Sequence, residues 1–134
     1  MVFSKENKAK ILIIDDEEDI CIYLKSILER TGKFNVLASM SPTDGLNLAK
    51  SFHPDLILLD IVMSGMDGTV VAEHLAKDES TKDILVAFVS VLAKANEVDE
   101  SGMIGKHHFI AKPIAKDELV ARIESLLQGA YSHR

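Results

Sequence analysis

The chain alternates between runs of large apolar residues and segments in which apolar residues recur at a helical spacing. Three runs, 11–14, 56–59 and 84–89, are apolar throughout. Such runs are typical of parallel strands that helices cover on both faces. Two shorter strand-like segments lie at 34–38 and 109–111. The pattern therefore predicts five strands.

Between and after these strands, apolar residues recur at the spacing of one helix face. Four such faces comprise Ile20, Leu24, Ile27 and Leu28; Leu46, Ala49 and Phe52; Val71 and Leu75; and Leu119, Ile123, Leu126 and Leu127. Ser41 precedes Pro42 and Asp44, an arrangement that caps and starts a helix. Residues 94–106 are polar and weakly patterned, and we interpret them as a marginal helix. A helix is thus expected after every strand.

Strict alternation of strand and helix predicts a parallel sheet with helices on both faces, because right-handed crossovers require it. The length of 134 residues suits one domain of ordinary size. We place a tail at 1–9, the domain at 10–128 and a second tail at 129–134. The expected fold class is a compact three-layer α/β domain.

Composition and charge narrow the class of protein. Apolar residues make up 47% of the chain and charged residues 27%, which is typical of a globular protein. The net charge of −6 disfavours general nucleic-acid binding. The chain has neither the roughly 18 consecutive apolar residues of a membrane span nor the core of a signal peptide. Cys21 is the single cysteine, which fits a reducing compartment. We therefore expect a cytoplasmic protein that binds neither membranes nor, directly, nucleic acid.

Polar side chains stand where four of the expected strands end. Asp15 and Asp16 follow the first strand, Asp60 the third, Ser90 the fourth and Lys112 the fifth. The carboxyl ends of parallel strands share one edge, where open α/β sheets bind ligands. Three carboxylates brought together repel one another unless a cation lies among them. Oxygen ligands without Cys or His favour Mg²⁺, or Mn²⁺, over zinc.

The same group of residues suits phosphoryl transfer. An aspartate can attack phosphorus and hold the group as an acyl phosphate. The transfer needs positioning and charge neutralisation, which a metal ion and Lys112 would supply. Ser90 would donate a hydrogen bond to a phosphoryl oxygen. The residues alone therefore predict a phosphoryl-transfer site.

These residues and their order resemble the receiver domain of two-component response regulators, including those of chemotaxis. The resemblance rests on four motifs: the pair Asp15–Asp16, Asp60 within the stretch 55–68, Ser90, and Lys112–Pro113. Each motif is weak alone, but all four occur in the family's order and at its spacing, over almost the whole chain. The resemblance implies a flavodoxin-like (βα)5 fold with strand order 2-1-3-4-5.

The resemblance also implies a role for each site residue. Asp60 would be the phosphoacceptor and would bind the metal directly together with Asp16. Asp15 would act through a water molecule, and the backbone carbonyl of Val62 would be a further ligand. Lys112 would contact the phosphoryl group. The domain would then catalyse its own phosphorylation and slow dephosphorylation without being a conventional enzyme.

Partners and switching follow from the same resemblance. The phosphoryl donor would be a histidine kinase or a histidine phosphotransfer protein. Ser90 and Phe109 would form the switch pair, with Phe109 moving inward, and the Lys112–Pro113 bond is expected to be cis. The change would reach the face formed by the fourth helix, fifth strand and fifth helix. A downstream effector protein or domain would read that face, which is also a candidate for a homodimer formed on phosphorylation.

Several residues around the site depart from the family pattern. Ser64 replaces the usual proline, which predicts a more mobile loop. Val91 stands where the family usually has alanine or glycine, and its bulk would narrow the access of small phosphodonors or of the hydrolytic water to the site. Val62 and Leu92 are apolar at the two positions that most vary the rate of aspartyl phosphate hydrolysis across the family. Phe109 has no phenol hydroxyl, so it can pack but cannot donate a hydrogen bond. Together these departures predict a long-lived aspartyl phosphate.

Two alternatives stay open at this point. A receiver-like interaction module that is never phosphorylated would have lost an acid or the lysine, and this chain has kept them. A phosphatase of the haloacid dehalogenase type would have a second aspartate where this chain has Val62. The remaining polar candidates have plain interpretations: 17–19 lie near a helix N-terminus, His107–His108 lie on the surface, and Cys21 packs in or near the core.

Overall fold

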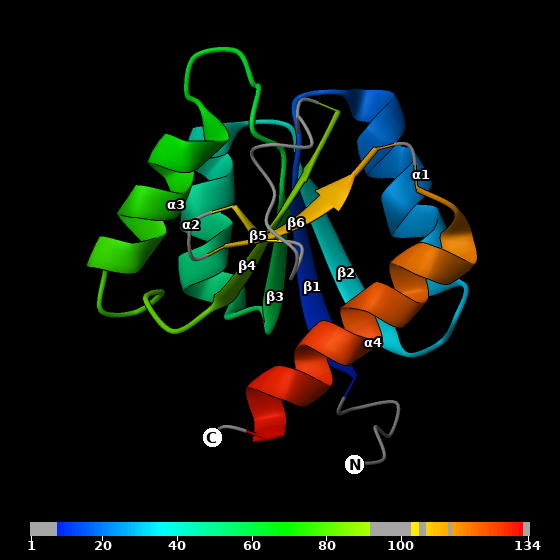
Figure 1. Ribbon diagram of the computed structural model, residues 1–134. Helices are drawn as coiled ribbons and strands as arrows, with labels where there is room; N and C mark the ends of the chain where they lie inside the picture. The colour runs from blue at the N-terminus through cyan, green and yellow to red at the C-terminus, as the bar shows by residue number, and fades with distance from the viewer. Residues whose placement is uncertain (1–7, 92–102, 105–106, 113, 133–134) are drawn as a thin grey trace.

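The structure is a computed structural model that describes residues 8–91, 103–104, 107–112 and 114–132. The strands are β1 (Ala9–Ile14), β2 (Phe34–Ser39), β3 (Leu56–Leu59), β4 (Leu85–Ser90), β5 (Met103–Ile104) and β6 (His107–Ala111). The helices are α1 (Glu18–Glu29), α2 (Pro42–Phe52), α3 (Gly68–Lys77) and α4 (Lys116–Ser132). Helices α1 and α4 cover one face of the sheet, and α2 and α3 cover the other (Figure 1).

The sheet confirms the predicted fold class. Strands β2, β1, β3, β4 and β6 run parallel in that spatial order, which is the expected 2-1-3-4-5 arrangement with β6 as the fifth parallel strand. The register pairs Ile14 with Leu59, and Ser90 with Ala111. The carboxyl ends of the central strands therefore meet at one edge of the sheet.

Strand β5 is an element that the sequence pattern did not predict. Met103 and Ile104 fall within 94–106, interpreted above as a marginal helix, yet they pair antiparallel with β6. Strand β6 is the last parallel strand, and this pairing satisfies backbone groups that an open edge would leave unpaired. The helix prediction is wrong for these two residues. The remainder of that segment lies outside the described residues.

Residues of the central strands point alternately to the two faces of the sheet, and both sets are buried. On β1, Ile11 and Ile13 join the core beside α1 and α4, whereas Leu12 and Ile14 join the core beside α2 and α3. All four side chains are at most 1% exposed, as are those of β3. Each such burial stabilises the fold by about 1.5–3 kcal/mol. Strongly buried strands thus fix the positions of the residues that follow them.

The boundaries of helices α2 and α4 can be compared with those predicted from the sequence. Helix α2 begins at Pro42 after the N-cap Ser41, whose hydroxyl accepts a hydrogen bond from the Asp44 amide at 3.3 Å, as predicted. Helix α4 begins at Lys116 and continues to Ser132. It therefore runs into the stretch 129–134, where the sequence led us to expect a tail.

Candidate functional site

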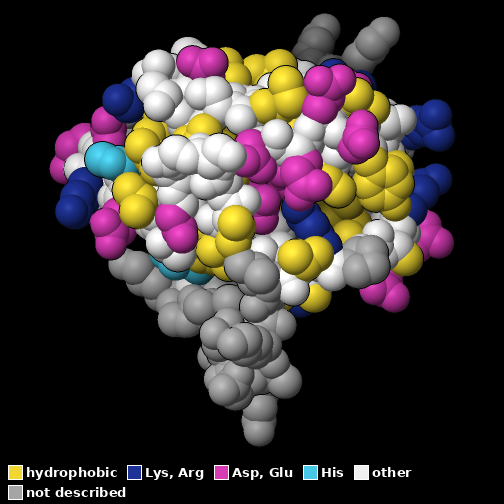
Figure 2. Space-filling model, turned by 90° about the horizontal axis from the view of Figure 1, so that it is seen from above, with side chains coloured by type: hydrophobic (Ala, Val, Ile, Leu, Met, Phe, Trp, Pro, Cys, Tyr) yellow, Lys and Arg dark blue, Asp and Glu magenta, His cyan; other side chains and the backbone are white. Residues whose placement is uncertain are grey.

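Three carboxylates meet at the carboxyl edge of the sheet. Asp15 and Asp16 follow β1, and Asp60 follows β3, the neighbouring strand. One oxygen from each lies within 4.8 Å of the others. Asp15 and Asp60 are buried and Asp16 is half-buried. Figure 2 looks onto this edge and shows acidic side chains gathered in the middle of the face, with hydrophobic side chains around them. The sequence prediction that these acids come together is confirmed.

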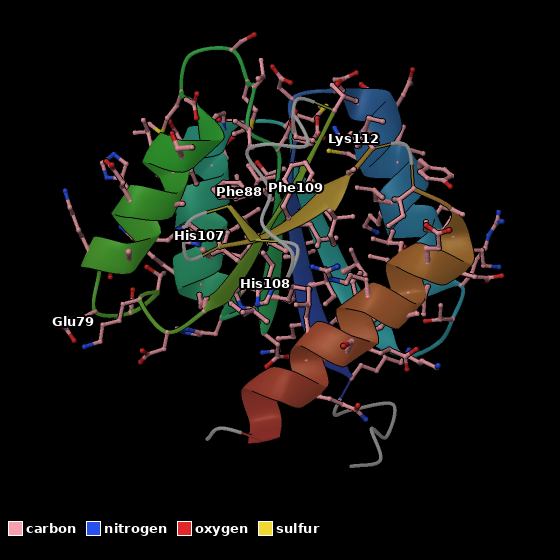
Figure 3. All side chains as sticks on the ribbon, in the orientation of Figure 1. Glu79, Phe88, His107, His108, Phe109 and Lys112 are labelled. Atoms are coloured by element: carbon pink, nitrogen blue, oxygen red, sulfur yellow. The ribbon has the colours of Figure 1, made fainter. Side chains whose placement is uncertain are left out.

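Lys112 supplies a positive charge to the same cluster. It follows β6 (Figure 3). Its backbone N–H donates to the Ser90 carbonyl at 3.0 Å. Its Nζ lies 2.7 Å from Oδ2 of Asp15 and 3.8 Å from Oδ2 of Asp60. The side chain is only 10% exposed, so these contacts are weakly screened by solvent. In this structure Lys112 is shared between two carboxylates and lies closer to Asp15.

The surroundings of Asp60 disfavour the ionised form of its carboxyl group. Burial, and next the negative charge of Asp15, raise the pKa of Asp60 from 3.8 to about 6. Lys112 and the Ile61 amide act in the opposite direction but do not offset these effects. A carboxylate in such a place gains from any cation that binds beside it. The raised pKa therefore fits a site built to receive a positive ion.

Backbone contacts fix the two buried acids. The Asp60 amide donates to the Ile14 carbonyl at 2.9 Å, which continues the pairing of β3 with β1 by one residue. Oδ1 of Asp60 accepts from the Ile61 amide at 2.9 Å. Oδ1 of Asp15 accepts from the Glu17 amide at 2.9 Å, just before α1 begins. These hydrogen bonds leave Oδ2 of each acid directed to Lys112.

Gly68 allows helix α3 to approach Asp60. Its amide donates to the Ile61 carbonyl at 2.7 Å. A Cβ atom at residue 68 would lie 2.0 Å from the Asp60 carbonyl oxygen and 2.8 Å from Cα of Ile61. Only glycine fits without a shift of the backbone. The start of α3 therefore rests directly on the backbone that carries Asp60.

Asp16 is held by a contact that the sequence did not predict. Its Oδ2 accepts a hydrogen bond from the Ser64 backbone amide at 2.8 Å. We expected the replacement of proline by Ser64 to make this loop more mobile. Proline has no N–H, so the substitution permits this bond between two loops that are 48 residues apart in sequence, and the mobility of the loop stays a prediction.

Cys21 is buried, as predicted, and has a further contact with the site. Its Sγ donates to the Asp15 backbone carbonyl at 3.1 Å. Burial, and next the charge of Asp15, raise the pKa of the thiol to about 11. The thiol thus stays protonated and supports the backbone of Asp15, a role that only the folded arrangement reveals.

The predicted switch residues are buried, whereas the two valines predicted near the site are exposed. Ser90 is 1% exposed at the end of β4, and Phe109 is 5% exposed beside Phe88 of the neighbouring strand (Figure 3). Phe109 is thus already buried in this structure, whereas the predicted switch moves it inward. Val62 and Val91 are exposed, at 54% and 68%. Pro113, with its predicted cis bond, and Leu92 lie outside the described residues.

His107 and His108 are half-buried rather than fully on the surface. The ring of His107 packs edge-on against Phe88, with 5.2 Å between centroids. Burial, and next the charge of Arg122, lower the pKa of His108. The possible metal-binding cluster found among the described residues consists of Asp15, Asp16 and Asp60, without either histidine.

The donor set of the cluster fits a hard divalent cation. Carboxylate oxygens are the ligands that Mg²⁺ prefers, and it commonly takes one or two of them together with water and phosphate oxygens. Among the described residues, one lysine, Lys112, offsets the charge of these three acids, through its contacts with Asp15 and Asp60. Acidic residues therefore remain for a cation to neutralise.

Comparison with known proteins agrees with this arrangement. Residues 11–124 match the model of the response regulator receiver domain family. The chain is a response regulator receiver domain. A receiver structure described as CheY-like, from Methanospirillum hungatei, superposes with a TM-score of 0.81 at 26% identity, covering 95% of this chain and 99% of that one. This membership removes the phosphatase alternative.

The curated relatives of this chain include a longer protein and a protein of similar length. RpaA of Synechocystis, described as a DNA-binding dual master transcriptional regulator, is 33% identical over 89% of this chain and 49% of its own length. PilH of Pseudomonas aeruginosa is 32% identical over 90% of this chain and 99% of its own length. The receiver thus spans about half the length of several curated relatives that it matches. No helix in the described part of the chain is both long and apolar enough to cross a membrane.

Proposed function

We propose that Asp60 accepts a phosphoryl group from a phosphohistidine donor. The observation that carries this proposal is the position of the Asp60 side chain, which is 6% exposed and has its Oδ2 3.8 Å from Lys112 Nζ. Asp15 and Asp16, which follow β1, lie beside it. A pKa of about 6 leaves the carboxylate mostly ionised at neutral pH. An ionised carboxylate next to an ammonium group and a cation site has what an attack on phosphorus requires.

The two oxygens of Asp60 have different surroundings, which suggests which one reacts. Oδ1 accepts the Ile61 amide, whereas Oδ2 faces Lys112. We assign Oδ2 as the nucleophile. A bond forms between Oδ2 and phosphorus while the phosphorus–nitrogen bond of the donor breaks, and the imidazole nitrogen keeps the electron pair. Lys112 would then contact the transferred group and balance part of its charge.

Asp16 and Asp60 would bind Mg²⁺ or Mn²⁺ directly, with Asp15 acting through water and the Val62 carbonyl as a further ligand. When bound, the ion supplies charge neutralisation for the phosphoryl oxygens. Its binding among the acids also favours the ionised form of Asp60, since a nearby positive charge lowers a carboxyl pKa. The chain's own contribution is to hold the three acids in place through strands β1 and β3.

The signal would pass through Ser90, which lies at the end of β4 next to the Lys112 backbone. The phosphoryl group adds acceptor oxygens that would draw in the Ser90 hydroxyl. Movement there and at Phe109 would alter the surface near β6 and the last helix, where an effector or a second copy would bind. Receivers work with histidine kinases and effector partners, and we propose such partners for this chain in the cytoplasm.

Intact mass spectrometry tests the proposal. The purified protein is incubated with a phosphorylated histidine phosphotransfer protein and Mg²⁺. We expect one phosphoryl group on the wild type and on Asp83→Asn, a matched control at the opposite edge before β4, and none on Asp60→Asn. An undiminished adduct on Asp60→Asn would overturn the proposal. Slow decay of the adduct in Mg²⁺ would support the long-lived phosphate predicted from the departures at Ser64, Val62, Val91, Leu92 and Phe109 together, and rapid decay would contradict it.

A further inference from the structure

The loop between β3 and α3 returns to the acidic loop that follows β1. At the point of return, the Ser64 amide donates to Oδ2 of Asp16 at 2.8 Å. Ser64 itself is exposed, and Asp16 is the least buried of the three clustered acids. The contact therefore joins the accessible side of the cation site to a surface loop.

Asp16 depends on this contact more than its neighbours do. Asp15 has both Lys112 and the Glu17 amide as partners, and Asp60 has the Ile61 amide and the nearby Lys112. For the Asp16 carboxylate, the Ser64 amide is the one hydrogen-bond donor within the described part of the chain. The orientation of this carboxylate is thus set by the loop.

Contacts before and after Ser64 hold the loop that carries its backbone amide. At its start, the Ile61 carbonyl accepts from the Gly68 amide at 2.7 Å, which closes the loop at its base. Gly65 turns the chain with a φ of 87°, a conformation that glycine adopts without strain. Asp67 then caps α3 by accepting from the Thr69 amide at 2.7 Å. Contacts on both sides of Ser64 therefore determine where its N–H points.

We propose that the Ser64 backbone amide is a positioning group for the cation site, and that it couples occupancy of that site to the β3–α3 loop. This inference rests on the proposed metal binding by Asp16. With Oδ2 held by the amide, Oδ1, to which none of the described residues donates, would be the oxygen presented to a cation, so less freedom would be lost on binding. A hydrogen bond to an ionised carboxylate is also stronger than one between neutral groups. By linkage, a bound cation must stabilise the docked loop to the same extent.

Two substitutions at one position separate the amide from the side chain. Ser64→Ala removes the hydroxyl and keeps the N–H, whereas Ser64→Pro removes the N–H. Mn²⁺ binding is measured by electron paramagnetic resonance, without any phosphoryl donor. We expect Ser64→Ala to bind Mn²⁺ as the wild type does, and Ser64→Pro to bind it about 3- to 10-fold more weakly. This loss lies at or below the low end of the loss in metal affinity that follows removal of a supporting hydrogen bond, because this hydrogen bond is exposed. Equal affinities for the two variants would overturn the inference.

A second measurement on the wild type guards against a misfolded proline variant. Mg²⁺ should slow hydrogen exchange of the Ser64 amide several-fold, because a cation on Asp16 stabilises, by linkage, the arrangement in which this amide is docked on Oδ2. Unchanged exchange at saturating Mg²⁺ would contradict the coupling. Failure of the wild type to bind Mn²⁺ would instead count against the proposed cation site. Failure of phosphorylation with normal Mn²⁺ binding would count against Asp60 as acceptor and leave the role of Ser64 intact.

Discussion

At the scale of single residues, Asp60 combines deep burial with a negative charge that its surroundings do not fully balance. Lys112 is nearer to Asp15 than to Asp60, and Asp15 itself raises the Asp60 pKa. Protein stability is therefore reduced by the ionised form of a residue on which function would depend. Functional sites often carry such a cost in stability.

Replacing Asp60 with asparagine should stabilise the metal-free protein at high pH. The pKa of Asp60 is raised from 3.8 to about 6 on folding, so the folded state binds the proton more tightly than the unfolded state does. The resulting stability is present below pH ~4 and is lost as the pH rises through about 6. Asp60→Asn should therefore gain about 1–3 kcal/mol at pH 8, and the gain should vanish towards pH 4. Urea unfolding in a metal chelator measures both values.

The control for this measurement is again Asp83→Asn, for which no such pH-dependent gain is expected. Adding Mg²⁺ at pH 8 should stabilise the wild type more than Asp60→Asn, because the cation binds the folded cluster. A gain of the same size at pH 4 and pH 8 would show that ionisation of Asp60 is not its cause.

The residues of the site could be predicted from the sequence, but several of their contacts could not. Asp15, Asp60 and Lys112 stand directly after predicted strands, so a parallel sheet brings them together. The Ser64–Asp16 and Cys21–Asp15 hydrogen bonds depend on how loops and a helix approach the strand ends. No local pattern encodes that approach.

At the scale of elements, the position of helix α3 depends on the close contact between Gly68 and the Asp60 backbone. The helix starts where the chain leaves the site, with Asp67 as its N-cap. Any group larger than hydrogen at residue 68 must push the helix away from the strand end. The geometry of Asp60 and the packing of α3 are therefore linked.

Gly68→Ala should be destabilising although alanine favours helices. The added Cβ would lie 2.0 Å from the Asp60 carbonyl oxygen, so the backbone must shift at a cost of about 1–3 kcal/mol. Gly129→Ala is the matched control, because a Cβ there meets nothing within 4 Å and it should gain about 0.5–1 kcal/mol in α4. Thermal unfolding compares the two. A Gly68→Ala protein as stable as Gly129→Ala would contradict the close contact.

The parallel strands and the four described helices were predictable because each has its own apolar pattern. Strand β5 was not, since Met103–Ile104 is too short for a pattern and forms only by pairing with β6. Short edge strands arise from the neighbour that they pair with rather than from their own sequence. The sequence thus predicted the elements that have an apolar pattern of their own and missed the two-residue strand that has none.

At the scale of the whole molecule, four strands contribute to one site. Residues from β1, β3, β4 and β6 reach the same edge because the strands are parallel and in register. Family membership accounts for the fold and the class of signalling. The central functional proposal is that, among the acids gathered at this edge, Asp60 alone receives the phosphoryl group.

Trapping the acyl phosphate with borohydride tests that proposal most directly. Reduction converts a phosphorylated aspartate to homoserine, and peptide mass spectrometry then locates the modified residue. After reaction with a phosphohistidine donor and Mg²⁺, homoserine is expected at residue 60 and not at residue 15 or 16. Homoserine at either of those acids, with residue 60 unmodified, would contradict the assignment of Asp60 as the acceptor.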